Sequence, residues 1–155
     1  MVKVKYSNAY TEVYEILKYL NKVEYNKIPK EFLEVIKENR NLDYEYKMND
    51  DIDLNNQPML IETKAILLNI YRDYLATSEQ RGKIEKWQNE DREFIENKKE
   101  EKYNVNVFES KIENKDKVEY NEIKQENNQL IEYHQKNIFR RVIEKLRNFI
   151  KRKSL

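Results

Sequence analysis

The chain lacks cysteine altogether and contains one glycine, two prolines and one histidine among its 155 residues. Without cysteine it can form no disulfide, thiolate metal site or thiol nucleophile, which fits a reducing compartment. Phosphate-binding loops and dinucleotide fingerprints need several glycines, because the backbone must approach the phosphate or adopt a positive φ. The single glycine excludes both motifs in recognisable form and argues against a turn-rich β-sandwich or barrel.

Long apolar runs are missing as well. The longest, AILL at residues 65–68, is far too short to span a membrane. The first residues, MVKVKYSNAY, lack the apolar core of a signal peptide. We therefore expect a cytoplasmic protein, and peripheral contact with a membrane stays open as an alternative.

Charged residues make up 38% of the chain and apolar residues 39%, although the formal net charge is only +1. A typical globular domain is about 25% charged, so this composition favours long helices with one buried stripe and broad solvated faces. We expect a mainly α-helical fold: a small helical bundle, followed by an extended charged helix or connector and a C-terminal amphipathic helix.

Apolar residues at helical spacing predict the helices of the bundle. The first helix follows Ser7 or Asn8 as N-cap, and a short second helix begins near Pro29. Residues 2–6 and 42–48 alternate in polarity, so a minor two-stranded β element is an open alternative. The expected buried positions of the two helices are Tyr10, Val13, Tyr14, Leu17, Leu20, Phe32, Val35 and Ile36.

The best candidate for a central helix follows Pro58, because apolar residues occupy most of its circumference. After it, Thr77 and Gln80 form a capping-box pattern that starts another helix. The expected apolar positions are Leu60, Ile66, Leu67, Ile70, Tyr71, Tyr74 and Leu75 in the central helix, and Ile84, Trp87, Phe94 and Ile95 in the next. These patterns predict a helical domain at residues 6–96, a charged connector at 97–128 and a basic amphipathic helix at 129–155.

Several segments together resemble a group of small bacterial proteins of unknown function. They are YTEVYEIL, the Ile28–Pro29 pair, DYEY, RDYLAT with Gln80 and Arg81, and the basic tail with Phe139 and Phe149. The resemblance implies a recurring domain with a basic tail. It implies no activity, cofactor or site residue.

Two acidic patterns invite a metal-dependent interpretation. In IETK, Glu62 and Lys64 follow Asp51 or Asp53 much as in some nucleases, but that chemistry needs the two residues on one face of a strand. Here the spacing is helical, and we expect Glu62 to lie in an ordinary first turn. NDDIDLNN lacks the glycine and closing glutamate of a calcium-binding loop, so we expect a solvated capping loop.

The remaining candidates have simpler interpretations. His134 is the only histidine and has no identifiable catalytic partner, so we expect an exposed or interfacial residue. Trp87 lies on an apolar stripe, which favours core packing over a role as a binding anchor. Arg72 and Asp73 are adjacent and favour a local charge pair. We expect no enzyme activity and no cofactor.

The C-terminal segment is the most distinctive feature. From residue 135 onward the chain has eight basic residues and one acidic residue. Its apolar residues lie on one arc of a helix and its basic residues on the opposite arc, and we consider ten of them candidate partner-binding residues. The ten are Phe139, Arg140, Arg141, Val142, Lys145, Leu146, Phe149, Ile150, Lys151 and Arg152.

Such a helix has several possible uses. It can bind a groove of another protein, lie on an anionic membrane, contact nucleic acid, or pack on its own domain as the last core helix. The hypothesis we favour is a non-enzymatic interaction or regulatory protein that acts through protein–protein contact, either a cellular adaptor or an inhibitor from a mobile element. The alternative is a membrane-surface or nucleic-acid-associated protein that binds through this helix. The oligomeric state is not predictable from the sequence.

Overall fold

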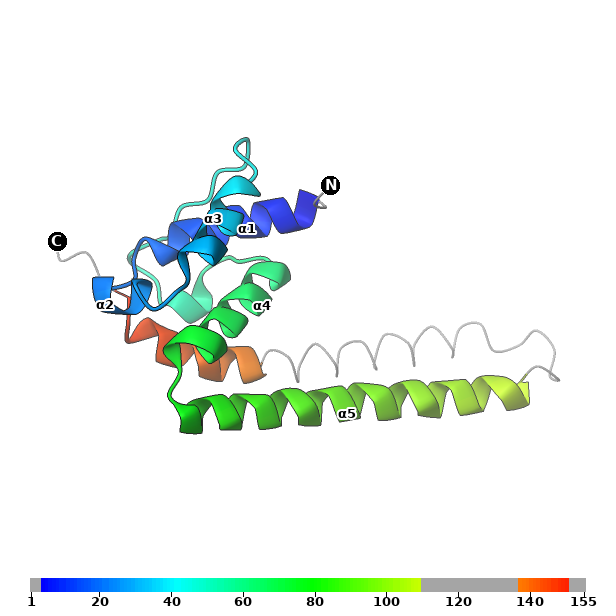
Figure 1. Cartoon of the computed structure of the whole chain (residues 1–155). Helices are drawn as coiled ribbons and strands as arrows, with labels where there is room; N and C mark the ends of the chain where they lie inside the picture. The colour runs from blue at the N-terminus through cyan, green and yellow to red at the C-terminus, as the bar shows by residue number, and fades with distance from the viewer. Residues whose placement is uncertain (1–3, 110–136, 151–155) are drawn as a thin grey trace. The chain divides into compact units, whose positions relative to one another are not determined.

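The computed structural model describes residues 4–109 and 137–150, with side chains outside the description from 101 to 109 (Figure 1). The chain forms two compact units: unit 1 is Met1–Arg81 with Phe139–Leu155, and unit 2 is Gly82–Ile138. The chain therefore leaves unit 1 and later returns to it. This division differs from the predicted boundaries at 96 and 129, because the C-terminal segment shares a unit with the N-terminal helices.

The mainly helical prediction is confirmed. The C-terminal segment adds a helix at residues 137–147, orange to red in Figure 1, which has no label there. The labelled elements are α1 (Val4–Leu17), α2 (Lys22–Tyr25), α3 (Lys30–Glu38), the 3-10 helix η1 (Leu54–Asn56), α4 (Ile61–Ile70), the π-helix η2 (Tyr71–Leu75) and α5 (Ser78–Glu109).

The two segments with alternating polarity do not form a two-stranded element in the described residues. Residues 4–6 belong to α1, and residues 44–49 have no regular secondary structure. An isolated antiparallel bridge instead joins Leu20 to Ile150. Two short segments without a wider apolar sheet would gain too little from pairing alone.

The predicted start of the first helix was wrong. Because α1 already begins at Val4, Ser7 and Asn8 lie inside the helix. Instead of capping the helix, both residues bind Asn41 in the loop after α3. The carbonyl of Ser7 accepts from the Asn41 backbone N–H at 3.1 Å, and Asn8 Oδ1 accepts from Asn41 Nδ2 at 2.8 Å. Thr11 Oγ1 donates to the Asn41 carbonyl at 3.0 Å. The loop is thereby fixed against α1.

The core of unit 1 lies between α1, α3, α4 and the C-terminal helix. Eight of the fifteen predicted apolar positions in unit 1 are buried and most of the others are half-buried. Val35 is 47% exposed, because only one narrow side of α3 faces the core. Tyr74 is partly exposed and packs its ring against Phe32, with centroids 5.8 Å apart. The fully buried side chains of α1, α3 and α4 include Val13, Ile16, Ile36, Leu67 and Ile70.

The capping box at the start of α5 is confirmed. Thr77 N–H donates to Gln80 Oε1 at 3.0 Å, and Gln80 N–H donates to Thr77 Oγ1 at 3.3 Å. From this start α5 runs to Glu109, so residues 97–109 of the expected connector are helical. Within unit 2, Trp87 on α5 is partly exposed, whereas its apolar stripe favoured a core position.

Candidate interaction surface

The C-terminal helix packs its apolar side inside unit 1. Phe139 is 9% exposed, Val142 and Ile143 are 0%, and Leu146 is 1%. The ammonium of Lys64 on α4 lies 5.3 Å from the centroid of the Phe139 ring. Three of the ten predicted partner-binding residues, Phe139, Val142 and Leu146, therefore contact the protein's own core.

The residues after this helix continue the contact. The carbonyl of Phe149 accepts from the backbone N–H of Asn21 at 2.9 Å and from its side-chain Nδ2 at 3.3 Å. The Phe149 ring stacks on Tyr71, with centroids 6.2 Å apart and 25° between the planes. Ile150 forms the isolated β-bridge with Leu20, so each of the five apolar candidates of this segment contacts another part of unit 1.

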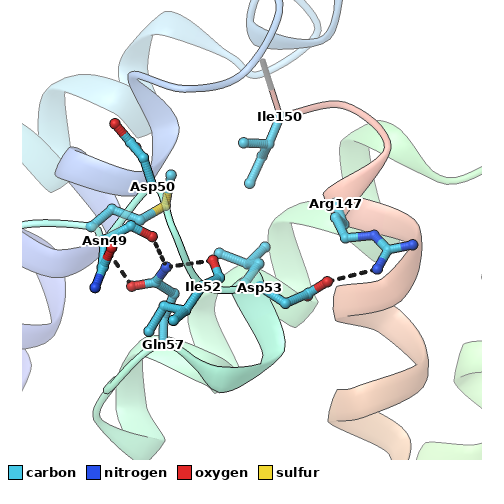
Figure 2. Close-up of a pocket in the computed structure, with 9 residues that line it drawn as sticks. Asn49, Asp50, Ile52, Asp53, Gln57, Arg147 and Ile150 are labelled. Atoms are coloured by element: carbon cyan, nitrogen blue, oxygen red, sulfur yellow. Dashed lines mark hydrogen bonds and ion pairs between the residues drawn. The ribbon is translucent and has the colours of Figure 1, made fainter. Parts of the chain in front are cut away.

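An acidic loop meets the basic helix beside a small pocket (Figure 2). Arg147 Nη1 donates to Asp53 Oδ2 at 2.6 Å, and this contact raises the pKa of the Arg147 guanidinium. The buried amide of Gln57 shapes the loop: Oε1 accepts from the Asn49 N–H at 3.0 Å, and Nε2 donates to the Ile52 carbonyl at 3.1 Å. The pocket is small, with a volume of about 40 Å³.

These contacts account for the NDDIDLNN segment. Asp53 caps η1 by accepting from Asn55 N–H at 3.1 Å, in addition to its contact with Arg147. Asp50 and Asp51 are exposed. Asp50 and Asp51 are solvated as predicted, but the loop caps η1 within its own segment and does not cap the following helix α4. In the described ranges no group of three His, Cys, Asp or Glu side chains is arranged to hold a metal ion.

The basic side of the C-terminal helix faces away from the core. Arg140 is 75% exposed and forms only a loose pair with Glu144 at 3.7 Å. Arg141 is also exposed, and Lys145 is partly exposed. Lys151 and Arg152 lie outside the described residues. We call Arg140, Arg141 and Lys145 the basic arc.

The structure also contains a buried carboxylate that the sequence interpretation missed. Glu12 on α1 is 2% exposed and accepts from Tyr44 Oη at 2.7 Å, from the Leu60 N–H at 2.9 Å and from Thr63 Oγ1 at 2.5 Å. Leu60 is the N-cap residue of α4 and has no capping side chain, and Glu12 accepts the Leu60 N–H from another helix, as the glutamate of a capping box does. The sequence did offer one indication that Glu12 is buried, because it lies at helical spacing between the apolar residues Ala9 and Ile16 of α1.

This carboxylate also changes the acidity of two tyrosines. Its hydrogen bond to Tyr44, with burial and its negative charge, raises the pKa of Tyr44 to about 12. Burial, together with the same charge, raises the pKa of Tyr46 to about 12. The raised pKa values keep both phenols neutral even at alkaline pH, so Tyr44 remains a hydrogen-bond donor to Glu12.

Two hollows open beside α1. One, of about 290 Å³, is lined by polar groups such as Thr11, Asn41 and Tyr44, but these are already bonded within the fold. The other, of about 220 Å³, lies between α1, α2 and α3, with Leu17 and Ile36 among its lining residues. In the first hollow, the Thr11 hydroxyl donates to the Asn41 carbonyl and the Tyr44 hydroxyl to Glu12, so both hydroxyls help to hold the fold together.

The other sequence candidates have ordinary surroundings. Glu62 lies in the first turn of α4, as predicted. Arg72 and Asp73 form the expected local pair, with Nε and Oδ1 2.7 Å apart. His134 lies outside the described residues. The helices of residues 4–109 and 137–150 include none that is long and apolar enough to cross a membrane.

No protein-family model matches the chain, and neither the curated proteins nor the solved structures contain a match. The resemblance to small bacterial proteins of unknown function stays an expectation. The functional argument therefore rests on the contacts of the described residues.

Proposed function

We propose that the protein is a non-enzymatic interaction or regulatory protein that acts through contact with another protein, as a cellular adaptor or as an inhibitor from a mobile element. The C-terminal helix carries the proposal. Its apolar residues pack inside unit 1, whereas Arg140 and Arg141 remain exposed. A partner would meet a cationic surface held on a helix with a packed apolar side, and an acidic protein surface is the complement.

The packing of this helix weakens the membrane alternative. An interfacial helix inserts its apolar side between lipids. Here Val142, Ile143 and Leu146 are at most 1% exposed, so insertion would require removing the helix from the core of unit 1. Contact through the basic arc requires no such rearrangement.

The nucleic-acid alternative keeps one supporting observation, because exposed arginines can contact phosphates in any sequence context. Stacking on bases would add affinity for single strands. The two aromatic residues of this segment, Phe139 and Phe149, instead lie against Lys64 and Tyr71 of unit 1. This arrangement favours an acidic protein surface over a single-stranded nucleic acid.

A capture experiment from the native host tests the proposal. The tagged full chain is compared with a variant of the basic arc, Arg140→Glu, Arg141→Glu and Lys145→Glu, and with a control that changes charge equally at Lys5, Lys30 and Lys47, each to Glu. These control lysines are exposed on unit 1 outside the C-terminal segment. We expect one protein at stoichiometric amounts with the wild type and the control, and its loss with the arc variant.

The partner is then purified and its affinity measured directly with all three forms. Equal affinity for the arc variant would contradict the proposal. Retention on DNA or RNA that weakens steeply with salt, without any protein partner, would support the nucleic-acid alternative. Co-sedimentation with anionic vesicles would support the membrane alternative.

A further inference from the structure

One buried aromatic residue connects three separate parts of unit 1. Tyr71, the first residue of η2, is 0% exposed. Its ring stacks on Phe149 of the C-terminal segment at 6.2 Å. Its hydroxyl donates to Gln80 Oε1 in the first turn of α5 at 3.0 Å. Tyr71 therefore contacts both the returning C-terminal segment and the start of the longest helix.

The oxygen that receives the Tyr71 hydroxyl has a second function. Gln80 Oε1 also accepts from the Thr77 N–H, the bond that closes the capping box of α5. The next amide, Arg81 N–H, donates to the Thr77 carbonyl at 2.8 Å. The position of the Tyr71 hydroxyl thus bears directly on the order of the first turn of α5.

Hydrogen bonds from Arg81 form a second connection between the π-turn and the start of α5. The guanidinium of Arg81 donates from Nε to the Arg72 carbonyl at 3.0 Å and from Nη2 to the Asp73 carbonyl at 2.8 Å. Within the turn, Ala76 N–H donates to the Tyr71 carbonyl at 2.7 Å. Single π-turns are rare and often occur at functional sites, because they give one residue an unusual placement. Tyr71 is the first residue of this π-turn.

We propose that Tyr71 is a positioning residue that makes the order of the first turn of α5 depend on whether the C-terminal segment is packed in place. While Phe149 lies on its ring, Tyr71 holds Gln80 in the capping box. When a partner displaces Phe149 while the helix of residues 137–147 stays packed, the Tyr71 ring loses this neighbour and the first turn of α5 loosens. A binding event at one end of the chain would thus reach the base of a helix that runs to Glu109. The inference does not depend on which partner binds.

Site-resolved amide exchange of the full chain tests the coupling. Phe149→Leu removes the stacked ring and keeps an apolar side chain. It should raise the exchange rates of the Gln80 and Arg81 amides about fivefold, the equivalent of one ordinary hydrogen bond. The matched control is Phe32→Leu, which removes the ring beside Tyr74 in the same π-turn and should leave these two amides unchanged.

A second variant separates coupling from general loosening. Tyr71→Phe keeps the ring but lacks the hydroxyl, so it should raise the same two rates, and adding Phe149→Leu should raise them little further. The Leu67 amide in α4 reports global opening and should keep its rate in every single variant. Unchanged Gln80 and Arg81 rates in Phe149→Leu, an equal rise in Phe32→Leu, or simple additivity of the two changes would each overturn the proposal. Phe149→Met replaces Phe149→Leu if the latter fails to fold.

Discussion

The junction between α1 and α4 and the junction between the C-terminal helix and the acidic loop both depend on a carboxylate, in opposite surroundings. Glu12 is 2% exposed and accepts hydrogen bonds from Tyr44, Leu60 and Thr63. Asp53, by contrast, meets Arg147 where the side chains are 26% and 46% exposed. A buried carboxylate is costly unless hydrogen bonds replace its lost hydration, whereas water screens an exposed pair.

The comparison shows which charges hold this protein together. The chain is rich in charged residues, and most of those whose burial the structure describes lie on solvated faces where a single pair adds little. A few buried polar groups, Glu12 above all, join segments distant in sequence. Four expected outcomes test this distinction, beginning with the largest effect.

A carboxylate buried without partners should unfold unit 1. Leu67→Asp places an acid at a position that is 0% exposed in α4, without the donors that surround Glu12. Burying an unpaired charge costs several kcal/mol, comparable to the whole stability of a small domain. Circular dichroism should show loss of cooperative unfolding. The control Ile61→Asp, at a site 67% exposed in the same helix, should stay folded.

Removing the satisfied carboxylate should be the next largest change. Glu12→Ala leaves the Leu60 N–H and the Thr63 and Tyr44 hydroxyls without their acceptor, and we expect a loss of about 3 kcal/mol in the free energy of unfolding, measured with urea. Glu15→Ala on the same helix removes only a surface pair with Lys18 and should have little effect. Equal losses in the two variants would show that burial does not distinguish these acids.

Tyr44→Phe should produce a smaller loss that depends on pH. The folded pKa of Tyr44 is raised from 10.0 to about 12, so the fold favours the neutral phenol. Its contribution is fully present below about pH 10 and is lost as pH rises through 12. The difference in unfolding free energy between wild type and Tyr44→Phe should therefore be constant up to about pH 10 and shrink above it. A difference that grew at alkaline pH would be inconsistent with a neutral donor to Glu12.

Arg147→Ala should have the smallest effect. Although the Asp53 contact is only 2.6 Å long, Arg147 is largely solvated, and salt screens such pairs. We expect the urea midpoint to stay close to that of the wild type and to the Arg140→Ala control, at both low and high salt. A large shift that disappears in high salt would mean that the acidic loop holds the C-terminal helix in place electrostatically.

Local features were predictable from the sequence because both partners lie close together in the chain. Thr77 and Gln80 are three residues apart, and their capping box forms as expected. The apolar side of α4 was recognisable for the same reason. In contrast, Glu12 bonds to residues 32, 48 and 51 positions away, so its role depends on the assembled fold.

The candidate site was predictable only in part. Helical spacing correctly separated Phe139 and Val142 from Arg140 and Arg141 on opposite sides of the C-terminal helix. The pattern alone could not say what covers the apolar side, since packing on the same chain, binding in a partner's groove and insertion into lipid all favour the same apolar residues. Contacts with Tyr71 and Asn21, more than seventy residues away in sequence, decide that question.

Native-state amide exchange of the C-terminal helix tests the central claim most directly, namely that this helix belongs to the core of unit 1 and leaves only its basic arc for a partner. The amides of Val142, Ile143 and Leu146 should exchange with the same opening free energy as those of Leu67 and Ile70 in α4, because both helices would then be released only by global unfolding. If the three C-terminal amides instead exchanged orders of magnitude faster than those of α4, the helix would detach on its own. Its apolar side would then be available for a membrane or a groove, which contradicts the account.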